Sequence, residues 1–288
     1  MACFHPLQAW KHFNGEVSFR KEAHALSHEI SLPCGNCVGC RLERSRQWSV
    51  RIMHEASLHD KNCFITLTYD EAHVPFDSGL HYEDFQCFMR KLRRTDKVRF
   101  FMCGEYGSLR LRPHFHACLF GIDFDDGKPV AAAASGGFIY SSDKLSVLWP
   151  QGYCSVGELT HASAAYVARY TLKKSSNPRV YDFLDVSTGE VISRVPEFVR
   201  MSLKPGIGSD WYDKFKSDVY PHDRVIVNGR AVKPPKYYDR KDADFSNSIT
   251  SLKRWEFAQA HLDDQTPERL SVREAVVKSR LSHLKRSL

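Results

Sequence analysis

Three short segments have the composition of β-strands, and they limit what this chain can fold into more than any other feature. Each is apolar and rich in β-branched or aromatic residues, as in CFITLTY (63–69), VRFFMC (98–103) and HFHACLFG (114–121). A turn carrying Gly104, Gly107 and Pro113 joins the second segment to the third. This arrangement predicts an antiparallel hairpin beside a further strand.

Helical patterns alternate with these strands. We predict helices over 41–59, 82–94 and 160–173. The second has apolar residues at spacings of three and four, at Phe85, Phe88, Met89 and Leu92, and the third is rich in alanine. The resulting order predicts an α+β fold, in which a central antiparallel β-sheet has helices packed on it.

His114 and His116 lie two residues apart in the third strand. Side chains alternate between the faces of a strand, so both imidazoles point the same way, opposite to Phe115. Two neighbouring imidazoles can begin a metal site. An isolated pair also fits two structural histidines, so its surroundings have to decide between these interpretations.

Glu105 ends the partner strand of the predicted hairpin. A carboxylate there would complete a set of two histidines and one carboxylate, leaving positions open for water and a phosphate oxygen. The alternative interpretation is a solvated residue in the turn.

Tyr166 and Tyr170 are four residues apart in the third predicted helix. That spacing puts both phenols on one helix face, and Lys173 falls close to the same face. A phenol is a weak nucleophile at neutral pH unless a cation stabilises its oxyanion, which a lysine could help to do. The alternative is an aromatic pair packed on the sheet.

Three segments resemble motifs 1, 2 and 3 of the HUH rolling-circle replication initiators, in the family's order. They are CFITLTYD (63–70), GEYGSLRLRPHFHACLFG (104–121) and YVARYTLKK (166–174). Together with LPCGNCVGCRLERSRQW (32–48), they are most similar to the gokushovirus branch of the single-stranded DNA microviruses. The resemblance covers roughly residues 1–175, and the C-terminal third matches only in general character.

The resemblance implies a role for each matching residue. His114 and His116 would bind Mg²⁺ or Mn²⁺ with Glu105 as third ligand, and the catalytic residues would be Tyr166, Tyr170 and Lys173. Thr66 and Thr68 of the first motif would support the sheet beside the site.

The activity implied is that of a phage replication initiator. It would nick the viral strand at the origin by tyrosine transesterification, form a 5′-phosphotyrosine adduct and religate displaced single-stranded circles. Host helicase and DNA polymerase would be its partners, because the chain has no GxxxxGK[ST] nucleotide-binding loop. The alternatives are a single-tyrosine HUH transposase or relaxase, and a non-catalytic zinc-stabilised nucleic-acid-binding module.

Four of the nine cysteines are candidates for a separate metal site. Cys34, Cys37 and Cys40 have CxxCxxC spacing, and Cys3 is the expected fourth ligand, with His5 as a substitute. A tetrahedral structural Zn²⁺ suits this set. An iron–sulfur cluster and unliganded thiols are the alternatives.

The net charge of +7 is moderate, but basic residues gather beside these motifs. Such groups can follow a phosphate backbone, or they can simply be solvated helix faces. The expected DNA contacts are Arg41, Arg44, Arg46, Tyr106, Arg110 and Arg112.

Three segments are expected along the chain: a Cys-rich segment with a basic helix (1–60), an HUH endonuclease core (61–178) and a C-terminal extension (179–288) that would bind DNA or a partner. No segment resembles a secretory signal, and no stretch reaches the ~20 apolar residues of a membrane span. We therefore expect no membrane association and a location in the cytoplasm of a bacterial host.

Overall fold

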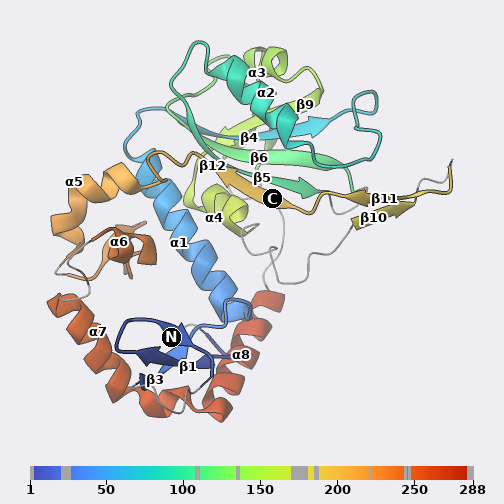
Figure 1. Cartoon of the computed structure of the whole chain (residues 1–288). Coiled ribbons are helices and arrows are strands. Elements are labelled where there is room, and N and C mark those ends of the chain that lie inside the picture. The colour runs from blue at the N-terminus through green and yellow to red at the C-terminus, as the bar shows by residue number, and fades with distance from the viewer. Residues whose placement is uncertain are drawn as a thin grey trace. The chain divides into compact units, whose positions relative to one another are not determined.

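A computed structural model describes residues 3–20, 27–107, 111–133, 137–169, 181–184, 188–220, 222–242, 245 and 248–283 (Figure 1). The chain forms two compact units. Unit 1 combines Met1–Arg44 with Ser251–Arg286, and unit 2 contains Ser45–Thr250. This division differs from the three consecutive segments expected from the sequence, because the last helices cluster with the N-terminal strands. No helix among the described residues is long and apolar enough to cross a membrane.

Unit 1 contains a small antiparallel sheet and helices from both ends of the chain. The sheet has the order β2-β1-β3, with β1 Leu7–His12, β2 Val17–Ser18 and β3 Ser27–Leu32. Helix α1 (Val38–Ala56) begins in this unit and continues into unit 2. The C-terminal elements are α7 (Ile249–Ala260), η3 (Leu262–Gln265) and α8 (Pro267–Ser282).

Unit 2 is built on a seven-stranded antiparallel sheet with the order β12-β5-β6-β4-β9-β8-β7. Its strands are β4 Asn62–Tyr69, β5 Arg99–Tyr106, β6 Pro113–Phe120, β7 Lys128–Ala132, β8 Phe138–Ser141, β9 Gly152–Glu158 and β12 Phe198–Met201. The predicted α+β fold and the β5–β6 hairpin are confirmed. Residues 123–142, which resemble an inserted loop in the sequence, instead contain the β7–β8 hairpin.

Helices cover both faces of this sheet. Because side chains alternate, one face of β4, β5 and β6 packs against α2 (Tyr82–Leu92) and α3 (Asp143–Leu148). The other face packs against the second half of α1 and against α4 (His161–Arg169). The first face is almost wholly apolar, whereas the second also carries polar side chains between its buried residues.

The remaining described elements of unit 2 are hairpins and short helices. They are β10 Tyr181–Leu184 with β11 Val191–Arg194, α5 Ser209–Val219, β13 Val225–Val227 with β14 Arg230–Val232, and α6 Lys236–Lys241. Aromatic rings join α5 and α6 to α1. His54 of α1 stacks on Trp211 and shares a hydrogen bond with the Tyr238 hydroxyl at 2.7 Å.

Candidate active site

The polar side chains on the α4 face come together through strand register. Glu105 of β5 pairs with His114 of β6, and Cys103 pairs with His116. On the other side of β6, Thr66 of β4 pairs with His116. Positions two apart share a face, so the glutamate and both histidines point from adjacent strands into the same space. We call Glu105, His114 and His116 the His–Glu site.

One carboxylate oxygen lies at the centre of this site. The Oε1 atom of Glu105 is 2.8 Å from Nε2 of His114 and 2.8 Å from Nε2 of His116. Glu105 and His116 are buried, and the His114 side chain is only 14% exposed. One ligand atom from each of the three residues lies within 4.8 Å of those of the other two. Such a cluster of nitrogen and oxygen donors can hold a divalent cation.

The protons available at His114 indicate that a cation fits here. His114 faces an acceptor at both ring nitrogens: Nε2 faces Glu105, and Nδ1 lies 3.0 Å from the backbone carbonyl of Arg112. A neutral imidazole has a single N–H and can satisfy only one of them. A cation between Nε2 and the carboxylate would satisfy the other. Within the described part of the chain, Oε2 of Glu105 is also buried without a hydrogen-bond partner.

The second histidine is oriented by a hydroxyl. Oγ1 of Thr66 is 2.9 Å from Nδ1 of His116, and Phe64 stacks on the same imidazole. A hydrogen bond at Nδ1 leaves Nε2 free to act as a ligand, which is the usual arrangement for histidines that bind metals.

Tyr166 of α4 completes the group. Its hydroxyl donates a hydrogen bond of 2.7 Å to Oε1 of Glu105, the oxygen that both histidines contact. Its ring meets the His116 ring edge-on, and the Arg169 guanidinium lies 5.4 Å from its ring centre. The predicted nucleophile and the three predicted ligands therefore share one site.

The pKa shifts follow from burial and these contacts. Burial by itself raises the pKa of Glu105, but hydrogen bonds from His114 and His116 outweigh it and lower this pKa to about 2. Burial lowers the pKa of His116, although Glu105 opposes the effect. Burial and the charge of Glu105 raise the pKa of Tyr166, so the phenol keeps its proton in this arrangement.

The predicted DNA contacts differ in their placement. Arg41 is exposed, whereas Arg44 donates to the carbonyl of Gly35 and Arg46 to that of Lys233. Arg112 is mostly buried and donates to the Tyr69 carbonyl.

Tyr106, another predicted DNA contact, packs in the core of the opposite sheet face. It is 7% exposed and donates from its hydroxyl to the carbonyl of Val195. Because it directly follows Glu105 in β5, its side chain points to the other side of the sheet from that carboxylate. An interpretation that places Tyr106 in the hairpin turn misses this alternation.

Tyr170, Lys173 and Arg110 lie outside the described residues, so their roles stay predictions from the sequence. Phe64 and Arg169 have no role predicted from the sequence, and the structure brings both to the site. A signal for Arg169 is present, because it follows Tyr166 by three residues in a helix. The partner of Phe64 depends on the pairing of β4 with β6, which motif spacing does not reveal.

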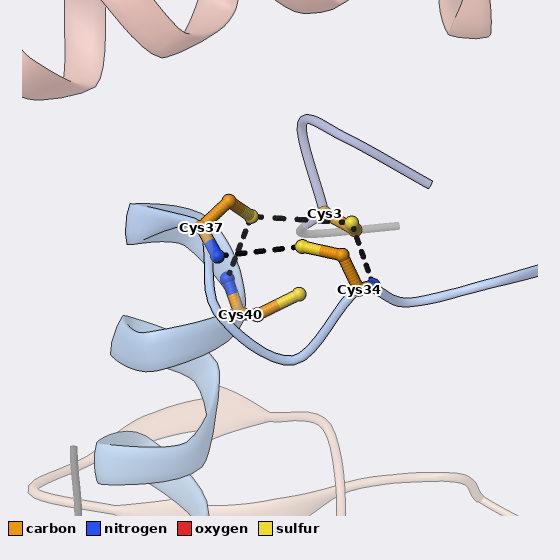
Figure 2. Close-up of side chains that lie close together, drawn as sticks. All are labelled: Cys3, Cys34, Cys37 and Cys40. Atoms are coloured by element: carbon orange, nitrogen blue, oxygen red, sulfur yellow. Dashed lines mark hydrogen bonds between the residues drawn. The ribbon is translucent and has the colours of Figure 1, made fainter. Parts of the chain in front are cut away.

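The four predicted zinc ligands are also brought together, in unit 1. One Sγ atom from each of Cys3, Cys34, Cys37 and Cys40 lies within 4.8 Å of the other three (Figure 2). His5, the predicted substitute, is exposed and pairs instead with Glu274 at 2.9 Å.

Comparison with known proteins gives the same family from several directions. The model of the replication-associated protein ORF2 family matches residues 62–175, a span that contains the His–Glu site and Tyr166. The chain is 33% identical to the replication-associated protein ORF2 of Spiroplasma virus 4 over 267 residues, which cover 84% of this chain and 80% of that protein.

Two further relatives extend this result. The chain is 30% identical over 254 residues to the replication-associated protein VP4 of Bdellovibrio phage phiMH2K, covering 83% of this chain and 76% of the relative. It is 30% identical over 217 residues to the replication-associated protein ORF4 of Chlamydia phage 1, covering 72% and 52%. No solved structure matches the chain.

Proposed function

The chain belongs to the replication-associated protein ORF2 family, and from this premise we propose that it starts phage DNA replication by nicking a single DNA strand with a tyrosine. One observation carries the proposal. The Tyr166 hydroxyl and both histidine Nε2 atoms converge on a single oxygen of Glu105, at 2.7, 2.8 and 2.8 Å. A nucleophile beside a set of metal-type donors is what metal-assisted phosphoryl transfer needs.

His114, His116 and Glu105 are the residues that would hold the cation, Mg²⁺ or Mn²⁺. When bound, such an ion supplies positive charge that polarises the scissile phosphate and lowers the pKa of nearby oxygen nucleophiles. The unmatched acceptor at His114 and the buried Oε2 atom of Glu105 support this assignment. Both would gain a partner.

Tyr166 is the proposed nucleophile. Its phenolic oxygen would attack the phosphorus, forming a phosphotyrosine ester while the bond from phosphorus to the 3′ oxygen breaks. The phenolic proton leaves and the departing 3′ oxygen gains one, so the products are a 5′-phosphotyrosine and a free 3′-OH. Glu105 accepts the phenol's hydrogen bond, and this fixes the oxygen that attacks. Arg169 supplies the nearby positive charge.

The second half of the reaction is assigned to residues known from the sequence. Tyr170, four residues after Tyr166, would attack the regenerated junction, with Lys173 assisting. The released 3′-OH would then reverse the first ester and close a circle. The covalent ester retains the energy of the phosphodiester, so this step needs no ATP. A host polymerase would extend the 3′-OH, and a host helicase would separate the strands.

The test is adduct formation on single-stranded oligonucleotides that tile the replicon carrying the gene. With Mn²⁺ or Mg²⁺ present, wild-type protein should form a denaturation-resistant adduct on one oligonucleotide. Tyr166→Phe with Tyr170→Phe should abolish it, whereas Tyr153→Phe, at an exposed position of β9, should not. If the wild type forms no tyrosine-dependent adduct on any oligonucleotide, the nickase proposal is wrong.

The single variants separate the remaining schemes. In a two-nucleophile initiator, each single variant should still cleave, but it should lose the joining of two successive junctions. If Tyr166→Phe alone removes all cleavage while Tyr170→Phe retains both steps, the protein uses a single tyrosine.

A further inference from the structure

The cysteine cluster (Cys3, Cys34, Cys37 and Cys40) has no part in the proposed reaction. Figure 2 shows the four side chains pointing toward one another, from the N-terminal segment, the loop after β3 and the start of α1. All four belong to unit 1, and none forms a disulfide. We propose that the cluster binds one structural Zn²⁺ ion, which ties the N-terminal sheet to the beginning of α1.

The sulfur separations fit a tetrahedral ion. Four sulfurs about 2.3 Å from a central zinc lie roughly 3.8 Å from one another. The Sγ atoms of Cys3 and Cys37 are 3.9 Å apart, and all four lie within 4.8 Å. A disulfide would need about 2.05 Å. The spacing therefore leaves room for an ion and not for a bond.

Backbone N–H groups favour thiolates at these positions. The N–H of Cys34 points to Sγ of Cys3 at 3.3 Å, and the N–H of Cys37 points to Sγ of Cys34 at 3.3 Å. Sγ of Cys37 receives two more, from Phe4 at 3.3 Å and from Cys40 at 3.4 Å. Sulfur accepts such bonds far better as a thiolate than as a thiol, and second-sphere bonds of this kind orient metal ligands.

The surroundings compensate the negative charge that four thiolates leave around Zn²⁺. Helix α1 starts at Val38, so its positive N-terminal end lies at the cluster, and its first turn contains no acidic residue. Arg44 donates to the Gly35 carbonyl at 3.2 Å, within the loop that carries the ligands. Gly35 has φ of +78°, a conformation that glycine adopts without strain, and this allows the tight turn from Cys34 to Cys37.

The N-terminal sheet has little else to stabilise it. Among the described residues of unit 1, the buried ones are Cys3, Phe4, Ala9, Gly39 and Leu270. So small a core rarely supports independent folding, and small folds of this kind depend on metals or disulfides. Cys3 precedes β1 and Cys34 follows β3, so one ion would hold both ends of the three-stranded sheet.

The first test is metal content of the full-length protein after dialysis. Wild type should retain about one zinc ion per chain. Cys37→Ser and Cys40→Ser should lose it, and Cys87→Ser, at a half-buried position of α2, should keep it. The double variant His114→Ala/His116→Ala should also keep it, which separates this site from the proposed catalytic one. Iron with acid-labile sulfide in place of zinc, or retention of zinc by the cluster variants, would overturn the assignment.

A second test uses wild-type protein alone, so it does not depend on whether a variant folds. Alkylation of native protein followed by mass spectrometry reports the reactivity of each cysteine. A zinc chelator should make the four cluster cysteines react faster and leave the reactivity of Cys87 unchanged. Equal reactivity of the cluster with and without the chelator would show that no metal protects it, and the proposal would fail.

Discussion

Glu105 is the residue on which the candidate active site depends. One of its oxygens meets three donor groups, and hydrogen bonds keep its pKa near 2, so it is ionised throughout the neutral range. A glutamine has the same shape but no charge, and its amide nitrogen would repel the imidazole N–H groups. We expect Glu105→Gln to reduce adduct formation by about 100-fold, similar to the loss of one charge-stabilising group elsewhere.

The measurement is the single-turnover rate of adduct formation at saturating Mn²⁺. Far-ultraviolet circular dichroism of Glu105→Gln should match the wild type, so that the loss reports chemistry and not unfolding. An unchanged rate in a folded variant would show that the carboxylate charge has no role.

Thr66 allows a narrower test of the same site, because it contacts a ligand but not the proposed cation. Thr66→Val retains the shape of the side chain and removes the hydrogen bond to Nδ1 of His116. Loss of such a second-sphere partner typically weakens metal binding by about 10–100-fold. We expect the Mn²⁺ concentration for half-maximal activity to rise by that factor.

Thr68→Val is the matched control for this substitution. Thr68 lies on the same face of β4 and pairs with His114, but within the described structure only the Thr66 hydroxyl bonds to an imidazole of the site. If both valine variants shift the Mn²⁺ dependence equally, the effect comes from the strand and not from orientation of His116.

At the scale of elements, α5 and α6 pack on α1 through a buried histidine. His54 is 6% exposed, and burial lowers its pKa to about 3. In the unfolded chain its pKa returns to about 6.5. Between these values the unfolded state binds the additional proton, so stability falls as the pH drops from about 6.5 toward 3, by up to ~1.4 kcal/mol per pH unit.

We therefore expect His54→Asn to reduce the acid sensitivity of folding. Urea unfolding at pH 7.5 and pH 5.5 measures it: the difference between the two midpoints should be smaller in the variant than in the wild type. His222→Asn, at an exposed position, should leave that difference unchanged. An identical pH response in His54→Asn and wild type would contradict the prediction.

The elements also show what sequence patterns can and cannot predict. The β5–β6 hairpin was predictable because strand composition and turn residues are local, and that hairpin alone brings Glu105 opposite His114. The position of β4 between β6 and β9 was not, because strand order depends on contacts between distant segments. This order gives His116 its partner Thr66, and it gives β5 its outer neighbour β12.

The misplaced residues have the same origin. Val191–Arg200, which reads as one strand, is divided into β11 and β12 around Pro196, since proline cannot donate to a sheet. Tyr106 resembles a turn residue in the sequence because β5 extends further than its apolar composition suggests. The resemblance to replication initiators is confirmed by the family match, and it depended on motifs whose spacing survives these local differences.

At the scale of the whole molecule, the basic excess becomes a prediction about salt. The chain carries +7, and of the predicted basic contacts in the structure Arg41 is exposed, whereas Arg44, Arg46 and Arg112 donate to backbone carbonyls. Each phosphate contact to single-stranded DNA contributes about 0.7 to the slope of log affinity against log salt.

If Arg41 contacts a phosphate, Arg41→Ala should make that slope shallower by about 0.7, at any DNA sequence, in fluorescence anisotropy titrations with a labelled single strand. Lys11→Ala removes the same charge from an exposed position of β1 and serves as the control. A contact changes only the first slope, whereas a general effect of net charge changes both equally. Equal changes would therefore remove Arg41 from the DNA-binding surface and leave the +7 charge as a diffuse attraction, which acts on association without fixing where the strand lies.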